Sequence, residues 1–221
     1  MMKKTKFLVI VAALMVCSTT SAQFTSSSRS GSSVSTEGWN TFYFMYSPTT
    51  LEEKYDYKDV LKSGSVDLTG LSLGYERAIG LTQSIPLYLK VGGEVKYSFG
   101  KYTNEYKDDF KYSFLSVKVP VSVAYDFSVT DNIDILPYTG MYFRINAMGK
   151  QKDEEDDRSE DCFSDYDWSR FQVGWQIGAD VMFSKRYVAG INYSTDISKL
   201  YNEDGEKASS HAINIKLGIV F

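Results

Sequence analysis

The sequence has little of several residue types that would point to particular functions. It carries one histidine, two cysteines and four prolines in 221 residues. Acidic residues outnumber basic ones by 28 to 24, for a net charge of −4, which argues against nucleic-acid binding because that requires a basic surface. Past residue 22 there is no run of 18 apolar residues, so no membrane-spanning helix is expected.

The first 22 residues predict a signal peptide. Three lysines precede ten apolar residues, 7–16, and small residues end the segment at Ala22, where cleavage is expected. The remaining 199 residues hold 21 basic and 28 acidic side chains, so the net charge becomes −7. Residues 23–38 are rich in serine and poor in apolar residues, which predicts a flexible periplasmic lead.

The two cysteines do not predict a disulfide framework. Cys17 lies within the predicted signal peptide, which leaves Cys162 without an intrachain partner. Lipid attachment at Cys17 is disfavoured because the bulky Val16 stands where a small residue is usual.

Alternation of apolar and polar residues dominates the rest of the chain. It is clearest in four segments: 86–99, 113–127, 170–183 and 211–221. Weaker alternation marks four more: 39–48, 66–78, 134–146 and 187–197. A period of two residues indicates strands, and eight amphipathic strands predict an all-β fold, an eight-stranded antiparallel up-and-down transmembrane β-barrel over 39–221. In 39–48 either the odd-numbered or the even-numbered residues could face outward, because aromatic residues occur in both sets.

The connections between these segments also alternate in length. The short ones are 79–85, 128–133 and 184–186, and the long polar ones are 49–65, 100–112, 147–169 and 198–210. Outer-membrane barrels have short periplasmic turns and long extracellular loops. The pattern therefore predicts both chain ends on the periplasmic side.

Charge decides which face of each strand meets lipid. A lysine or arginine facing the bilayer midplane costs about 2–4 kcal/mol, so the nearly uncharged apolar faces are expected to point outward. The opposite faces carry six basic and five acidic residues: Glu76, Lys90, Glu94, Lys96, Lys118, Asp126, Arg144, Arg170, Asp180, Asp196 and Lys216. This near-balance predicts an ion-paired interior that plugs the barrel. The alternative is a soluble lipocalin-like barrel with the same faces inverted.

These features resemble a known family. The eight strands, the run Leu-Ser-Val-Lys-Val-Pro-Val at 115–121, the run Leu-Pro-Tyr-Thr-Gly at 136–140 and the terminal Phe221 are similar to the small outer-membrane β-barrel (porin-like, OmpX/OmpA-barrel type) superfamily. The resemblance implies the outer membrane of a Gram-negative-type envelope, with its lipid and lipopolysaccharide as partners. It also implies that Phe221 belongs to the signal read by the barrel-assembly machinery. No cofactor is expected.

The segment 151–167 carries nine acidic residues, and a solvated loop is the expectation. Carboxylates are ligands that hard divalent cations prefer, so weak metal candidates are Asp153, Glu154, Asp156 and Asp157, although no EF-hand spacing is present and no metal site is predicted. Bridging of cations to lipopolysaccharide phosphates and adhesion are the alternatives. An exposed Cys162 in this loop would allow pairing between molecules.

Two classes of function are open, with a third as a variant. The preferred prediction is a non-enzymatic barrel with a plugged interior that displays four loops for surface contact, envelope integrity or immune interaction, with an extracellular ligand as a candidate partner of the loops. The alternative is a lipid hydrolase using Ser209 and His211, although a lipid A deacylase has the order His-x-Ser and this chain has the reverse. A narrow conduit for very small solutes is the third.

Overall fold

The computed structural model describes residues 37–57, 60–103, 109–153, 159–165, 168–203 and 206–221. Every regular element in these ranges is a strand, and no helix long and apolar enough to cross a membrane occurs in them. The predicted signal peptide and all but the last two residues of the predicted lead lie outside the described residues.

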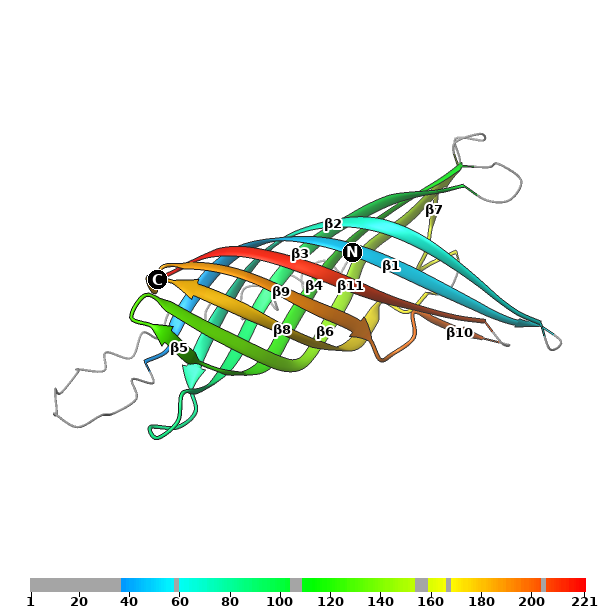
Figure 1. Ribbon diagram of the computed structural model, residues 1–221. Coiled ribbons are helices and arrows are strands. Elements are labelled where there is room, and N and C mark those ends of the chain that lie inside the picture. The colour runs from blue at the N-terminus through cyan, green and yellow to red at the C-terminus, as the bar shows by residue number, and fades with distance from the viewer. Residues whose placement is uncertain (1–36, 58–59, 104–108, 154–158, 166–167, 204–205) are drawn as a thin grey trace, which may run out of the picture. The chain divides into compact units, whose positions relative to one another are not determined.

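Eight long strands form the wall of the molecule (Figure 1). They are β1 (Trp39–Tyr57), β2 (Val60–Gly80), β3 (Leu87–Thr103), β4 (Asp109–Tyr125), β6 (Ile133–Asp153), β8 (Phe171–Phe183), β9 (Tyr187–Asp196) and β11 (Glu206–Val220). Three short strands extend the ladders at their ends: β5 (Phe127–Thr130), β7 (Ser159–Asp161) and β10 (Tyr201–Glu203).

The sheet closes on itself. Each long strand pairs antiparallel with its neighbours in the chain, and β1 also pairs with β11 from Thr41↔Val220 to Tyr55↔Glu206. Closure leaves no unpaired strand edge along the wall, which is the condition for a sheet to exist in lipid. The predicted eight-stranded antiparallel up-and-down barrel is confirmed.

Side chains alternate between the outer wall and the interior as the pleat requires. Leu217 on the outer wall is 59% exposed, whereas its chain neighbour Lys216 is 3% exposed inside. The charged faces therefore point inward and the apolar faces outward, which excludes the inverted, lipocalin-like arrangement. In β1, where the sequence left the faces open, Tyr43 and Met45 are buried inside and the aromatic residues at 42, 44 and 46 lie outside.

The two ends of the barrel differ. At one end, hereafter the turn end, short connections join β2 to β3, β5 to β6 and β8 to β9, as predicted. Phe221 lies there too, and its backbone exchanges hydrogen bonds with Asn40 at the start of β1. The opposite end, hereafter the hairpin end, carries the connections that the sequence predicted to be long loops.

The first two of these connections, 49–65 and 100–112, are largely paired strands, which corrects the prediction that they are loops throughout. β1 and β2 stay paired as far as Tyr57↔Val60, and β3 and β4 as far as Thr103↔Asp109. The reason is that backbone pairing continues beyond the apolar belt, while the alternation that marks a strand ends there because both faces can be polar in water.

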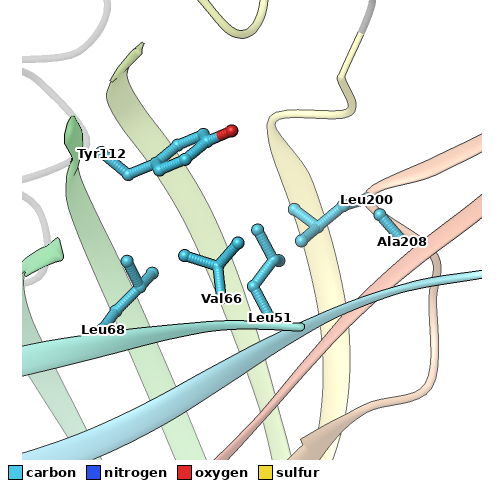
Figure 2. Close-up of a cluster of buried hydrophobic side chains, with 6 residues drawn as sticks. All are labelled: Leu51, Val66, Leu68, Tyr112, Leu200 and Ala208. Carbon is cyan, nitrogen blue, oxygen red and sulfur yellow. The ribbon is translucent and has the colours of Figure 1, made fainter. Parts of the chain in front are cut away.

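An apolar cluster closes the interior at each end. The turn-end cap consists of Leu136, Met182, Val188 and Val220, with Trp39 packed against them. The hairpin-end cap consists of Leu51, Val66, Leu68, Tyr112, Leu200 and Ala208, which point toward one another from separate strands and from the segment before β10 (Figure 2). Between the two caps the interior is polar.

Candidate functional site

The inner ionic layer is a four-residue network made of Glu76, Lys90, Asp180 and Lys216. Lys90 Nζ lies 2.9 Å from Glu76 Oε1 and 2.7 Å from Asp180 Oδ2. Lys216 Nζ lies 2.5 Å from the same oxygen of Asp180 and 3.7 Å from Glu76. All four side chains are buried. Two positive and two negative groups balance, so each buried charge has an opposite one in contact, as burial requires.

The outer ionic layer lies nearer the hairpin end and holds Glu94, Lys96, Lys118, Arg144 and Asp196. Lys118 Nζ lies 2.9 Å from Glu94 Oε2, and Arg144 Nη2 lies 2.7 Å from Asp196 Oδ2. The first pair joins directly opposite residues of the neighbouring strands β3 and β4, whereas the second joins β6 to β9, which are not adjacent in the sheet.

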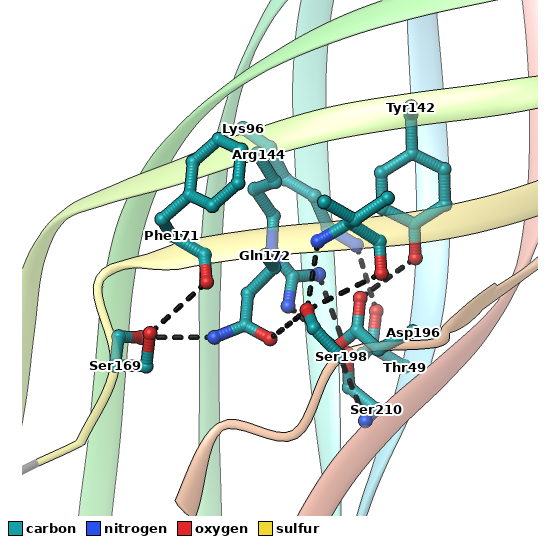
Figure 3. Close-up of polar contacts among 11 residues, drawn as sticks. Thr49, Lys96, Tyr142, Arg144, Ser169, Phe171, Gln172, Asp196, Ser198 and Ser210 are labelled. Atoms are coloured by element: carbon teal, nitrogen blue, oxygen red, sulfur yellow. Dashed lines mark hydrogen bonds and ion pairs between the residues drawn. The ribbon is translucent and has the colours of Figure 1, made fainter.

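Asp196 is the most heavily bonded residue of this layer (Figure 3). Its carboxylate accepts hydrogen bonds from Tyr142 Oη at 2.7 Å and from Ser210 Oγ at 2.6 Å, in addition to the Arg144 pair. Lys96 differs from the other two cations of this layer, because its Nζ donates to a neutral group, the hydroxyl of Thr49, at 2.8 Å.

Neutral polar side chains fill the space that remains. Asn214 Nδ2 donates to Asn192 Oδ1 at 2.6 Å, and Gln176 Nε2 donates to Ser122 Oγ at 2.9 Å. Tyrosine rings also occupy the lumen, at positions where the residue on the neighbouring strand is glycine.

Two such tyrosine–glycine pairs are clear. Tyr43 faces Gly74 across β1 and β2, and Tyr142 faces Gly174 across β6 and β8. A Cβ built at either glycine would overlap the tyrosine ring, so glycine is required there to let the ring occupy the lumen. Ion pairs, amides and rings thus occupy most of the interior between the two caps.

The outer wall at the hairpin end carries a row of lysines. Lys101, Lys111 and Lys152 are directly opposite one another on β3, β4 and β6, and Lys150 lies one pleat nearer the centre of the wall. All four side chains are exposed. They line a shallow groove of about 770 Å³ that also contains the apolar Phe99. The row therefore concentrates positive charge on one patch of the outer wall.

Ser209 and His211, the hydrolase candidates, lie on the outer wall of β11. No hydrogen bond joins them in the described part of the chain, and His211 Nδ1 lies 3.8 Å from Glu52 Oε1. A groove of about 350 Å³ beside His211 is lined partly by Thr50 and does not include Ser209. The geometry of an activated nucleophile is therefore absent from this pair.

A family model for an outer membrane protein beta-barrel domain matches residues 21–202. The chain belongs to this family. The resemblance inferred from the strand pattern is confirmed, and the family places the chain among outer-membrane barrels.

Solved structures similar to this outer-membrane barrel include Ail, the attachment invasion locus protein of Yersinia pestis. It shares 18% identity, with 84% of this chain and 99% of that chain covered and a TM-score of 0.39. The outer membrane enzyme PagL shares 12% identity, with 80% and 97% covered and a TM-score of 0.44. Neisserial surface protein A shares 16% identity, with 80% and 96% covered and a TM-score of 0.37. No curated protein matches the chain.

Most of the charges predicted inside the outer-membrane barrel are there. The inner and outer ionic layers account for nine of the eleven predicted charges. Arg170 is a correction: its side chain is 49% exposed and donates to the carbonyl oxygen of Ala147 at 3.1 Å. The reason is that Arg170 precedes the first residue of β8, so the pleat does not direct it inward. Asp126 is only partly buried, in the break between β4 and β5.

Sequence reasoning missed several interior residues. Asp134 at the turn end is buried, and so are Tyr43, Tyr138 and Tyr142 in the ionic layers. Asp134 and Tyr138 have the same parity as Arg144 in β6, and this was the available signal. The lysine row could not be found from parity alone, because it depends on the register between three strands.

The acidic side chains of the segment 151–167 that are described are exposed or half-exposed, as expected for a solvated loop, but Cys162 is not. Cys162 is 0% exposed, so an exposed cysteine that pairs between molecules is excluded by the structure. Its backbone N–H donates to the carbonyl oxygen of Gly149 at 3.0 Å, which holds the segment against the end of β6. The metal candidates at 154, 156 and 157, and the side chain of Asp153, lie outside the described residues.

Asp161 orders the turn that follows β7. Partial burial alone would raise its pKa, but the backbone N–H groups of Phe163 and Ser164 donate to its carboxylate at 2.9 and 3.1 Å. Together with Arg170 they hold the pKa of Asp161 below its usual value. The ionised form therefore stabilises this turn.

Proposed function

We propose that the protein is a non-enzymatic structural barrel that contributes to envelope integrity by binding lipopolysaccharide at its outer wall, with its interior plugged. The observation that carries the proposal is the lysine row of Lys101, Lys111 and Lys152 with Lys150 beside it. These side chains occupy the hairpin end, which we assign to the cell exterior. The short-turn end then faces the periplasm, as is general for outer-membrane barrels.

The position of the row supports this partner. On β3 the outward residues Tyr97 and Phe99 are apolar and largely exposed, and Lys101 is the next outward residue. On β6, Met148 is followed in the same way by Lys150. The lysines therefore begin where the apolar belt ends, at the level of lipid head groups. Phosphates of lipopolysaccharide lie at that level in the outer leaflet and supply the opposite charge.

The interior supports a plugged barrel over a conduit. Both ionic layers span the lumen, and an apolar cap closes each end. The lack of a hydrogen bond between Ser209 and His211 among the described residues, and the exclusion of Ser209 from the groove beside His211, support a non-enzymatic barrel. Mass spectrometry of lipid A and phospholipids is then expected to give the same acyl composition for the wild type and for Ser209→Ala/His211→Ala. Altered acyl chains in the wild type alone would favour the hydrolase.

The experiment measures binding of purified lipopolysaccharide to the refolded protein in mild detergent. Each lysine near an anionic surface contributes about 1 kcal/mol, so Lys111→Gln is expected to bind about fivefold more weakly. The triple variant Lys101→Gln/Lys111→Gln/Lys152→Gln is expected to lose about a hundredfold. Added salt is expected to weaken binding of the wild type more than that of the triple variant.

Lys185→Gln is the matched control, because Lys185 is an exposed lysine in the β8–β9 turn at the opposite end. It is expected to bind like the wild type. Folding of every variant is checked by the faster gel mobility of unboiled protein. Wild-type affinity in a folded triple variant would refute the proposal.

A further inference from the structure

The two ionic layers differ in net charge. The inner layer has two ammonium groups and two carboxylates, so it is neutral. The outer layer has three cations, Lys96, Lys118 and Arg144, and two carboxylates, Glu94 and Asp196. Each of the two carboxylates is already held by another cation, so the described side chains leave one positive charge in excess.

Lys96 carries this excess. Its side chain is buried, with 8% of the residue exposed. Its ammonium group donates to the hydroxyl of Thr49, and no carboxylate of the described side chains forms an ion pair with it. A buried ammonium without a counterion is expensive, because a neutral hydroxyl replaces only part of its hydration.

A cavity of about 40 Å³ adjoins Lys96, between the outer ionic layer and the hairpin-end cap. Its polar side is lined by Lys96, Arg144, Asn146 and Ser116, and its apolar side by cap residues such as Leu51 and Leu68. None of the described residues that line it is acidic.

The polar groups of the cavity that lack partners are donors. Asn146 is 5% exposed, and its Nδ2 has no hydrogen-bond partner. The Nε of Arg144 is likewise buried without a partner, although the other nitrogens of that guanidinium bind Asp196 and Ser210 (Figure 3). Lys96 and Asn146 flank Ser116 in one cross-strand row of β3, β4 and β6. The ammonium, an amide N–H and a guanidinium N–H thus come from adjacent positions of the wall.

We propose that this cavity binds one halide-sized inorganic anion, with Lys96, Arg144 and Asn146 as its donors. The anion supplies the missing negative charge of the outer ionic layer and accepts hydrogen bonds from the unpartnered donors. The volume accommodates a chloride, since a single water needs about 10–15 Å³ by the same measure. It is too small for a sulfate or a phosphate. The site is inside the barrel and is independent of the lysine row on the outer wall.

The test is the thermal stability of the refolded protein in detergent, in sodium chloride or bromide against sodium gluconate at equal ionic strength. A ligand that binds only the folded state raises the melting temperature in a saturable way. Chloride and bromide are expected to do so for the wild type. Sulfate stabilises folded proteins generally, so its effect is expected to be unsaturable and equal in wild type and variants.

Two variants each remove one donor, Lys96→Met and Asn146→Leu. In both, the halide concentration that gives half of the rise in melting temperature is expected to increase at least tenfold. Lys185→Met is the matched control, since Lys185 is an exposed lysine in the β8–β9 turn at the opposite end of the barrel, and it is expected to behave like the wild type. A wild type whose melting temperature is the same in chloride and gluconate would overturn the proposal. An equal halide effect in the wild type and Asn146→Leu would also overturn it.

Crystals of the wild type grown in bromide give a second measurement that does not depend on how the variants fold. An anomalous peak beside Lys96 Nζ and Asn146 Nδ2 is expected. A cavity that holds only water in such crystals would refute the proposal.

Discussion

Asp180 binds two buried ammonium groups at once, through a single carboxylate oxygen. Asp180→Asn removes the negative charge and leaves Lys90 and Lys216 to share Glu76. Breaking a buried ion pair from one side typically costs about 3–5 kcal/mol, because a charge is left without compensation. We expect Asp180→Asn to lower the free energy of unfolding by about that amount, measured by urea titration of the folded fraction on unboiled gels.

Asp131→Asn is the control for this prediction. The chemical change is the same, but Asp131 is exposed in the turn between β5 and β6. An exposed substitution of this kind changes stability by less than about 0.5 kcal/mol. Equal unfolding midpoints for the two variants would show that the inner layer is not held together by its charges.

At the residue scale, the sequence predicts which side chains are inside but not which partners they choose. The inward parity of Glu76, Lys90 and Asp180 follows from the period of a strand and the cost of charge in lipid. The partners depend on the lengths of the side chains and on their positions around the lumen. Lys90, for example, binds Asp180, which is 90 residues away in the sequence. Arg170 was misplaced because parity has no meaning outside a strand.

At the scale of elements, the turn between β8 and β9 is the point of backbone strain. Ser184 and Lys185 have φ of 49° and 52°, the left-handed region that both central residues of a type I′ turn require. Arg186 N–H donates to the carbonyl oxygen of Phe183 at 2.9 Å and closes the turn. A residue with a Cβ costs about 1 kcal/mol or more in this region.

Lys185→Gly is therefore expected to stabilise the barrel by about 0.5–1 kcal/mol, since glycine adopts this conformation without strain. The measurement is the urea midpoint of the folded fraction. Lys199→Gly serves as the comparison, because Lys199 has no positive φ and gains nothing from glycine. A midpoint for Lys185→Gly at or below that of Lys199→Gly would contradict the assignment of strain to this turn.

The hairpins show where element prediction from sequence ends. β1 and β2 were recognised as far as their apolar alternation extends, and their paired ladder continues to Tyr57 and Val60. Hydrophobic alternation reports contact with lipid, whereas strand pairing needs only backbone groups. Hydrophobic alternation therefore identifies the membrane-embedded part of each strand, and the part beyond it is predicted as loop.

At the scale of the whole molecule, the interior has a sequence of layers from end to end: an apolar cap, two ionic layers and a second apolar cap. The caps could not be predicted, because the hairpin-end cap draws single residues such as Leu51 and Leu200 from segments that are otherwise polar. Their apolar character matters only once eight strands place them in one cross-section.

These layers lead to an expectation about conductance. Wild-type protein in planar bilayers is expected to show no steady channel openings, with a general porin in the same lipid as the positive control. Trp168 stacks on Phe114 at 6.0 Å beside the hairpin-end cap, and Trp168→Ala loosens that end. The variant is still expected to be silent, because both ionic layers and the turn-end cap remain across the lumen. Steady openings in the wild type would show that the ionic layers admit solutes, and openings in Trp168→Ala alone would show that the hairpin-end cap is the whole barrier.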